Sequence, residues 1–332
     1  MPLETRWLVP PDPALEPPLA APVAIEVDGE RGRLFVLELQ PPELRVYDLA
    51  DGRFLAALGR EGDGPGEYRH PIDLAVSAGG LAAVLSVGGR VTYWAPEAVL
   101  AGVIRSGGGL ATDIVAARGD SFFVKIDRFP PADVAEFQVV TRDTVLDRPR
   151  FRDQGLPGTE EPGRVIRNHS YSVAATPQGN LLLAPPGPEY LILRITAEGK
   201  VGQTIRRPEI PPLQRSEEEV EAIRNRIRQG FAAAGRVAPA NLRVPLYRSH
   251  VSSLAVAPDG TIWALTQRGD GGVAIVDHFD SDGRFSGSYR VQLRVGELAV
   301  GPDALYLLAR SRLDVPGIAV AARPRTRRSG TR

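Results

Sequence analysis

The sequence contains no cysteine, and almost no lysine. The first absence excludes disulfide bonds, thiolate nucleophiles and cysteine-ligated zinc. Because Lys125 and Lys200 are the two lysines, arginine supplies nearly all of the positive charge, and 40 basic residues balance 40 acidic ones. A chain without net charge has no broad basic surface for DNA or RNA, so we expect no nucleic-acid partner.

Long apolar runs are also missing. No run approaches the roughly 20 apolar residues that a membrane-spanning helix needs, so the sequence predicts no transmembrane segment. The first 22 residues lack a basic stretch followed by an apolar one, the pattern of a secretory signal peptide. As written, the chain is expected to be soluble and not exported.

Glycine and proline are abundant, with 35 and 30 residues, which indicates many turns rather than long helices. A short apolar strand, a glycine-containing turn and a more apolar second strand recur six times. The first strands are centred on Ile25, Leu74, Ile114, Val173, Leu254 and Leu298. The second strands begin near Phe35, Ala82, Phe122, Leu181, Ile262 and Leu305.

A third strand follows in every repeat, and three repeats continue through an Asp-Gly or Glu-Gly turn into a fourth strand. The third strands are residues 44–49, 90–95, 135–140, 190–195, 273–279 and 317–322. Repeated four-stranded antiparallel units, arranged radially, form a propeller in which each sheet buries its faces against its neighbours. The sequence therefore predicts an all-β, six-bladed β-propeller with blades starting near residues 22, 69, 110, 168, 249 and 294.

The two ends of the chain are expected to meet in blade six and close the ring of blades. Blade six lacks a fourth strand of its own, and residues 5–10 form a strand without a partner, so we expect this segment to complete blade six. The alternative is a frayed N-terminus. One domain would then span residues 1–322, followed by a disordered basic tail at 323–332 that is either simply solvated or contacts an acidic surface.

One insertion interrupts the repeats. Residues 216–229 carry a capping box, Ser216 with Glu219, and an apolar stripe at helical spacing, which predicts an amphipathic helix ending at Gly230. The helix either packs on the rim of the propeller or serves as a lid or a partner-docking element.

The segment 47–76 resembles bacterial six-bladed propellers related to NHL repeats, whose characteristic loop reads G-x-G-P-G-E-aromatic and leads to a proline. The matching residues here are Gly62, Gly64, Pro65, Gly66, Glu67, Tyr68 and Pro71. Residues 259–265 are similar to the second-strand signature of the same proteins. The resemblance covers about residues 22–322 and implies a location in the bacterial cell envelope, although this chain has no lipobox cysteine. By itself the loop indicates a structural turn rather than a phosphate site.

Three of the four histidines occupy one repeat-equivalent position. His70, His169 and His250 each lie four residues before the centre of a first strand, and Arg294 is their equivalent in blade six. Three imidazoles gathered at the mouth of the central channel could bind zinc and leave one coordination position open. The amidating lyases, which are NHL-type propellers, are similar in using three histidines on a central metal. The alternative is that the histidines pack between blades.

A second equivalent position holds Asp73, Asp113 and Glu297, each directly before a first-strand centre. Carboxylates lining the channel could bind calcium, as in lactonase-like propellers, or could cap turns. No nucleophile elbow or dinucleotide fingerprint is present, so no catalytic residue is assigned.

These observations favour a non-catalytic propeller that binds a protein, peptide or glycan, most simply as a monomer. The alternative is a metal-dependent lyase or hydrolase with zinc or calcium at the channel mouth.

Overall fold

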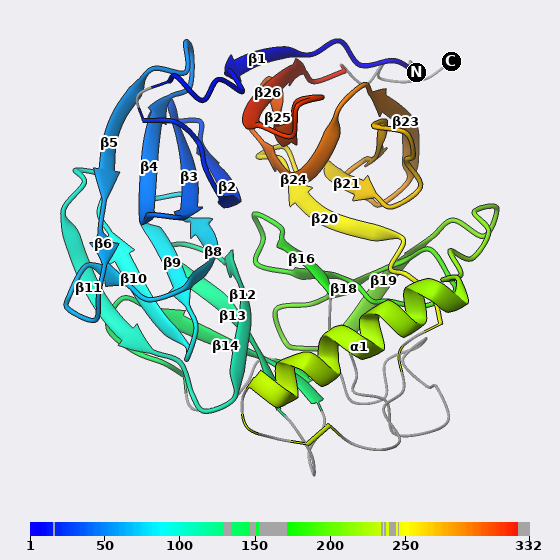
Figure 1. Cartoon of the computed structure of the whole chain (residues 1–332), viewed down its shortest axis with the longest axis horizontal. Helices are drawn as coiled ribbons and strands as arrows, with labels where there is room; N and C mark the ends of the chain where they lie inside the picture. The colour runs from blue at the N-terminus through cyan, green and yellow to red at the C-terminus, as the bar shows by residue number, and fades with distance from the viewer. Residues whose placement is uncertain are drawn as a thin grey trace.

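The computed structural model contains six four-stranded antiparallel sheets arranged around one axis (Figure 1). Each sheet is one blade, so the predicted six-bladed β-propeller is confirmed. The structure describes residues 1–15, 17–128, 134–146, 151–152, 171–233, 235, 237–238, 244 and 246–324. Within these ranges there is one helix, α1 (Glu217–Ala233).

The blades follow one another along the chain, and each runs from an inner strand at the axis to an outer strand at the rim. Blade 1 consists of β2 (Pro22–Asp28), β3 (Arg33–Leu39), β4 (Pro42–Asp48) and β5 (Phe54–Leu58), and blade 2 of β8 (Pro71–Val76), β9 (Ala82–Ser86), β10 (Arg90–Trp94) and β11 (Leu100–Arg105). Blade 3 consists of β12 (Leu110–Ala116), β13 (Ser121–Arg128), β14 (Val134–Thr141) and β15 (Phe151–Arg152), and blade 4 of β16 (Ser172–Ala175), β17 (Leu181–Ala184), β18 (Leu191–Ile195) and β19 (Val201–Arg206). Blade 5 consists of β20 (Val251–Val256), β21 (Ile262–Thr266), β22 (Ala274–Phe279) and β23 (Phe285–Val291).

Blade 6 combines the two ends of the chain. It contains β24 (Arg294–Val300), β25 (Ala304–Arg310), β26 (Pro316–Ala322) and the N-terminal β1 (Arg6–Val9), which pairs antiparallel with β26. The backbone amide of Leu3 donates to the carbonyl of Arg290 in blade 5 at 2.9 Å. The N-terminal segment therefore joins the outer edges of blades 5 and 6.

The chain leaves blade 6 through a residue with several contacts. The guanidinium of Arg323 donates to the carbonyl of Pro302 at 2.6 Å and contacts Asp259 of blade 5 at 2.5 Å. Arg323 thus belongs to the folded part of the chain. Residues 325–332, the rest of the basic tail expected from the sequence, lie outside the described residues.

The apolar core is divided into layers between blades. Six clusters of buried residues occur in the described chain, one at each blade junction. The cluster between blades 6 and 1, for example, joins Ile318 and Val9 to Leu34. Both faces of each sheet are covered in this way, which explains why middle strands such as β9 and β17 are buried along their whole length rather than at alternate positions.

Tight turns connect the strands on the side of the ring where the inner strands end. Gly52, Gly199 and Gly283 follow an acidic residue in hairpin turns of blades 1, 4 and 5, and all three have positive φ angles of 75–78°. Glycine adopts this left-handed conformation without a steric penalty, so the acidic-Gly pairs seen in the sequence specify these turns.

The insertion after blade 4 forms α1 and confirms the predicted helix. Its first turn has the expected capping box: the Ser216 Oγ accepts from the amide of Glu219 at 3.3 Å, and the Glu219 carboxylate accepts from the amide of Ser216 at 3.0 Å. The predicted C-terminal end is wrong, because the helix passes through Gly230 and ends at Ala233. Alanines favour the helix, and Phe231 extends the apolar stripe of Val220, Ile223 and Ile227 by one more turn.

A small two-stranded parallel sheet lies between blades 1 and 2. It pairs β6 (Arg60–Glu61) with β7 (Glu67–Tyr68) and contains the glycine-rich loop. The Glu67 carboxylate accepts from the amide of Gly64 at 2.8 Å and from Nε of Arg60 at 2.9 Å. Tyr68 is fully buried, and its hydroxyl accepts from Nε1 of Trp94 at 2.5 Å. These contacts give the loop the structural role indicated by its sequence.

Candidate functional site

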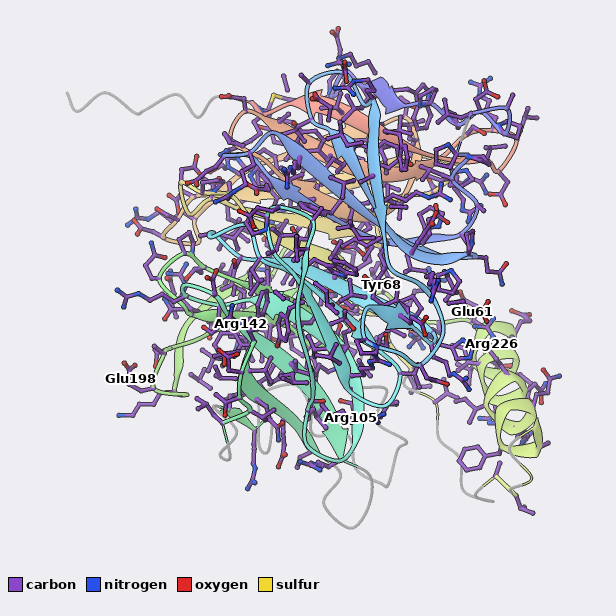
Figure 2. The ribbon with its side chains drawn as sticks, turned by 90° about the vertical axis from the view of Figure 1, so that its left-hand side faces the viewer. Glu61, Tyr68, Arg105, Arg142, Glu198 and Arg226 are labelled. Atoms are coloured by element: carbon purple, nitrogen blue, oxygen red, sulfur yellow. The ribbon has the colours of Figure 1, made fainter. Side chains whose placement is uncertain are left out.

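The inner strands β2, β8, β12, β16, β20 and β24 surround the axis, and all of them begin on the same side of the ring (Figure 1). We call this side the front face and the opposite side the back face. Figure 2 shows Glu61 and Tyr68 of the glycine-rich loop on the same side of the molecule as Arg226 of α1, whereas Glu198, in a hairpin turn, lies on the other side. The insertions and the inner strand ends thus share the front face.

Carboxyl groups gather on the inner strands. Asp73 of β8, Asp113 of β12 and Glu297 of β24 were expected from the sequence to be equivalent, and the structure brings them close enough to interact electrostatically. Glu26 of β2 joins this group and interacts with Glu297. These four side chains form what we call the carboxyl ring.

Burial is the main electrostatic feature of this ring. It raises the pKa of Glu26 to about 8, with a further contribution from the charge of Glu297. It raises the pKa of Glu297 to about 7, and it raises the pKa of Asp73 well above its usual value, helped by the charge of Asp113. The side chains of the ring are half-buried, and the protein packed around Glu26, Asp73 and Glu297 makes these three costly to charge.

A β-bulge positions three of these carboxyls. The register of the inner strand shifts immediately before Asp73, Asp113 and Glu297. The same shift precedes Ser253 in blade 5. Bulges redirect side chains next to functional sites, and here the shift recurs at one level of the propeller.

Hydrogen bonds from neighbouring strands hold the carboxyls in place. Asp73 accepts from the amide of Ile114 in blade 3 at 2.7 Å. Glu297 accepts from the hydroxyl of Ser253 in blade 5 at 2.6 Å. Asp113 forms an ion pair within its own blade, with its carboxylate 3.0 Å from Nζ of Lys125. The ring therefore fastens adjacent blades together while leaving Glu26 and Glu297 without a nearby cation among the described ion pairs.

The three predicted histidines occupy different settings. His70 is exposed and has a positive φ of 51°. His250 is 2% exposed; its Nε2 donates to the carbonyl of Pro188 at 3.1 Å, its ring lies 5.6 Å from that of Tyr190, and burial lowers its pKa. His169 lies outside the described residues, so the convergence of the three imidazoles stays a prediction. In the described part of the chain, no three His, Asp or Glu side chains are arranged to hold a metal ion.

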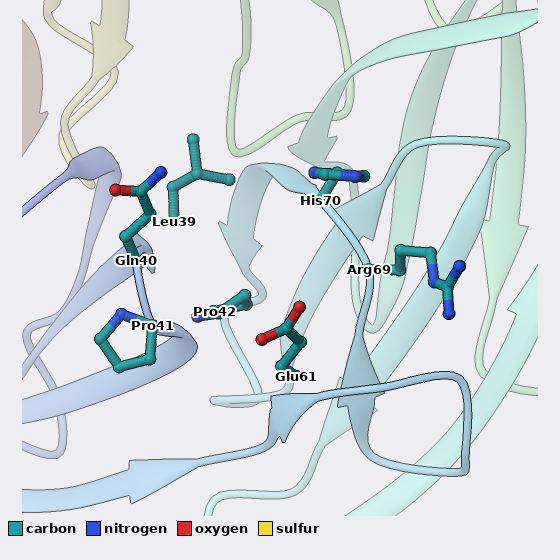
Figure 3. Close-up of a pocket in the computed structure, with 7 residues that line it drawn as sticks. All are labelled: Leu39, Gln40, Pro41, Pro42, Glu61, Arg69 and His70. Carbon is teal, nitrogen blue, oxygen red and sulfur yellow. The ribbon is translucent and has the colours of Figure 1, made fainter.

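A pocket of about 380 Å³ opens on the front face beside His70 (Figure 3). Leu39, Gln40, Pro41 and Pro42 of the β3–β4 hairpin form one side, and Glu61, Arg69 and His70 form the other. The largely apolar hairpin thus faces a carboxylate, a guanidinium and an imidazole. The left-handed backbone of His70 is uncommon for a residue with a side chain, and such conformations cluster at binding sites.

A second pocket, of about 310 Å³, lies between blades 6 and 1 and reaches the carboxyl ring at Glu297. It is lined by Pro22, Val23, Arg294, Val295, Gly296, Glu297, Leu308, Arg310 and Pro316. Arg294, predicted as a channel-mouth residue, is half-exposed here and forms an ion pair with Asp314 at 2.9 Å. The two pockets flank blade 1 on the front face.

Sequence comparison of the repeats missed Glu26. Blade 1 has Ala24 at the position of Asp73 and Glu297, and Glu26 lies two residues further on. Side chains two residues apart in a strand share one face. The alternation within β2 was therefore the signal that could have identified Glu26.

Comparison with known proteins supports the fold. No protein-family model and no curated protein sequence matches the chain. The calcium-binding protein regucalcin of Agrobacterium tumefaciens has a similar structure, with a TM-score of 0.55, 15% identity and coverage of 97% of this chain and 94% of that one. A candidate exported protein of Bacteroides fragilis gives a TM-score of 0.54, 13% identity and coverage of 97% and 95%.

A third similar structure is the β-propeller domain of Cps50 (Swd1) from Myceliophteria thermophila, with a TM-score of 0.50, 11% identity and coverage of 92% and 97%. At these identities the likeness extends to the propeller fold and no further. Within the described residues, no helix is long and apolar enough to cross a membrane.

Proposed function

We propose that the protein is a non-catalytic binding propeller, related to NHL-repeat proteins, that holds a segment of a peptide or protein ligand in the pocket beside His70. The main support for this proposal is the set of residues that line the pocket. Its volume of about 380 Å³ is suited to a small group. Leu39 and two prolines offer apolar contact area, and Glu61 and His70 offer an acceptor and a donor.

The lining favours a peptide over a glycan. None of the residues that line this pocket is a tryptophan, tyrosine or phenylalanine, the large rings on which a sugar could stack. The walls are also held in place, because the ion pairs and hydrogen bonds of the glycine-rich loop fix one side and a two-residue hairpin fixes the other. A preformed pocket reduces the entropy lost when a ligand binds.

The proposal is tested by selecting binders from a random peptide library displayed on phage and measuring their affinities by calorimetry. Leu39→Asp and His70→Ala should each weaken the selected peptides by about 10-fold or more, the size expected for losing a central contact. Val201→Asp, at an exposed site in the outer strand of blade 4, is the matched control and should leave binding unchanged. Failure to enrich any peptide, or equal binding by Leu39→Asp, would contradict the proposal.

Binding of a divalent cation at the carboxyl ring is a second candidate function. A metal-dependent lyase or hydrolase activity would require such a bound cation. Carboxylate oxygens are the ligands that calcium prefers, and Glu26 and Glu297 lack a described counter-ion. Because the described carboxyls are not already arranged around one point, calcium would have to draw them closer together. The similar structure of regucalcin, a calcium-binding protein, adds support. The zinc alternative uses His70, His169 and His250; it fits less well, because His250 already donates Nε2 to Pro188.

Calcium titration of the metal-free protein, followed by thermal unfolding, tests this candidate. A site that binds only the folded state should raise the midpoint of unfolding with calcium concentration. The effect should disappear in a Glu26→Gln, Glu297→Gln variant and persist in Glu30→Gln, which alters an exposed glutamate. Stoichiometric zinc in the purified protein that is lost in His70→Ala, His169→Ala would favour the histidine site instead.

A further inference from the structure

The pocket between blades 6 and 1 has an unusual distribution of charge. Arg294 of β24 and Arg310 of β25 are directly opposite each other in the strand register, so both side chains lie on one face of the sheet. Both also line the pocket. Like charges at directly opposite positions repel, and such a pair is unfavourable unless an anion lies between the two groups.

A single carboxylate, that of Asp314, forms ion pairs with both arginines. Asp314, in the hairpin between β25 and β26, lies 2.9 Å from Arg294 and 3.6 Å from Arg310. No other ion-pair partner of these two arginines occurs in the residues that the structure describes. Asp314 reaches them with a positive φ of 65°, a conformation that few residues with side chains adopt. Two guanidinium groups therefore share one carboxylate, which is 63% exposed.

The rest of the pocket suits a small molecule with an apolar part. Pro22, Val23, Leu308 and Pro316 supply apolar walls. A Cβ atom added at Gly296 would meet nothing within 4 Å, so the space in front of this residue is open. Burial raises the pKa of Glu297 at the inner end of the pocket to about 7, and this carboxyl is therefore largely protonated below neutral pH and repels an anion little.

We propose that this pocket binds a small ligand that carries a carboxylate beside an apolar group, with Arg294 and Arg310 contacting the carboxylate in place of Asp314. The planar guanidinium group matches a carboxylate through paired hydrogen bonds. Asp314 is the internal counter-ion that the ligand displaces. This site is separate from the pocket beside His70 and does not depend on the function proposed for that pocket.

Three probes of similar shape test the ligand class, with binding followed by ligand-observed NMR and calorimetry. Benzoate should bind in the millimolar range, and benzamide, its neutral counterpart, should bind at least 10-fold more weakly. Phenylphosphonate distinguishes a phosphoryl group from a carboxylate. Equal binding of benzoate and benzamide would overturn the proposal, and tighter binding of phenylphosphonate than of benzoate would overturn the assignment to a carboxylate.

Variants of the chain test the site. Gly296→Leu should fill the pocket and reduce benzoate affinity at least 10-fold, whereas Gly202→Leu, in the exposed outer strand β19, should not. Asp314→Asn should increase benzoate affinity about 5-fold, because the internal competitor is lost.

A double variant, Arg294→Gln with Arg310→Gln, should abolish binding of benzoate. If that variant fails to fold, Gly296→Leu and Asp314→Asn decide the question. A purely structural role for the two arginines predicts that Asp314→Asn destabilises the hairpin and leaves benzoate affinity unchanged, and this result would overturn the proposal.

Discussion

The two faces of the propeller are built differently. On the back face, short turns repeat from blade to blade, with left-handed glycines at matching places, such as Gly80, Gly179 and Gly260 between the first two strands of their blades. On the front face, the connections differ: a glycine-rich loop follows blade 1, a helical insertion follows blade 4, and both pockets flank blade 1. Repetition maintains the scaffold, and variation on one face supplies the binding sites.

This difference has a direct experimental consequence. Substitutions in the blade junctions and back-face turns should reduce stability and leave the pockets of the remaining folded protein unchanged. Substitutions on the front face should alter binding with little loss of stability.

Val9→Asp should have the largest effect. Val9 is fully buried in the cluster between blades 6 and 1 and pairs with Ile318. Burying an unpaired carboxylate there should lower the free energy of unfolding by about 3–5 kcal/mol, measured by urea denaturation. Arg6→Asp, at an exposed position in the same strand, should cost less than about 1 kcal/mol. Equal effects of the two variants would show that β1 does not close the ring.

Gly52→Ala should come next. Gly52 has a φ of 75°, and an added Cβ would lie 2.1 Å from the carbonyl oxygen of Leu8. The loss of stability should be about 2–4 kcal/mol, because both conformational strain and a backbone contact oppose the methyl group. Gly32→Ala is the control: its φ is 62° but the space around it is open, so only the strain of about 1 kcal/mol remains. Equal losses would mean that the contact with Leu8 is absent.

The number of blades was predictable because it depends on local patterns. Each repeat carries its own strands and turn residues, so six copies of one weak signal reinforce one another. The capping box at Ser216 is likewise local, and it located the start of α1 within one residue. The C-terminal end of α1 was less predictable, since Gly230 is tolerated when Phe231 continues the apolar stripe.

The candidate site was less predictable, because side-chain direction depends on structure that repeats do not encode. Equivalence placed Asp73, Asp113 and Glu297 at one level, but it did not reveal the bulges that direct them. His250 turns toward Tyr190, a residue from another blade. Pairing between distant segments, such as Arg294 with Asp314 across a hairpin, follows from the turn conformation and not from residue type.

Glu26→Gln should produce an intermediate effect that depends on pH. The pKa of Glu26 is about 8 in the folded chain against 4.5 as the ordinary value, so the folded state binds this proton more tightly than the unfolded state. Stability is therefore greatest below pH 4.5 and falls as pH rises toward 8. The glutamine variant, which cannot ionise, should be more stable than the wild type by about 1–3 kcal/mol at pH 8.

Urea denaturation at pH 5 and pH 8 measures this dependence. At pH 5, close to the ordinary pKa of 4.5, most of the difference between Glu26→Gln and the wild type should be gone, because the unfolded state then gains little free energy by ionising. Glu30→Gln, at an exposed site of the same blade, should show no such dependence on pH. A difference of the same size at both pH values would mean that Glu26 ionises as freely in the folded chain as in the unfolded one.

His70→Gly should have the smallest effect on stability and should separate the two faces most clearly. Glycine relieves the left-handed backbone at φ 51°, so the free energy of unfolding should rise by about 0.5–1 kcal/mol while binding of the selected peptides is lost. Ala98→Gly, at φ 63° in a back-face turn, should give a similar gain without any change in binding. If both variants keep full binding, the left-handed conformation of His70 serves only the fold. If only His70→Gly loses binding, the front face keeps this unfavourable conformation because the ligand requires the imidazole there.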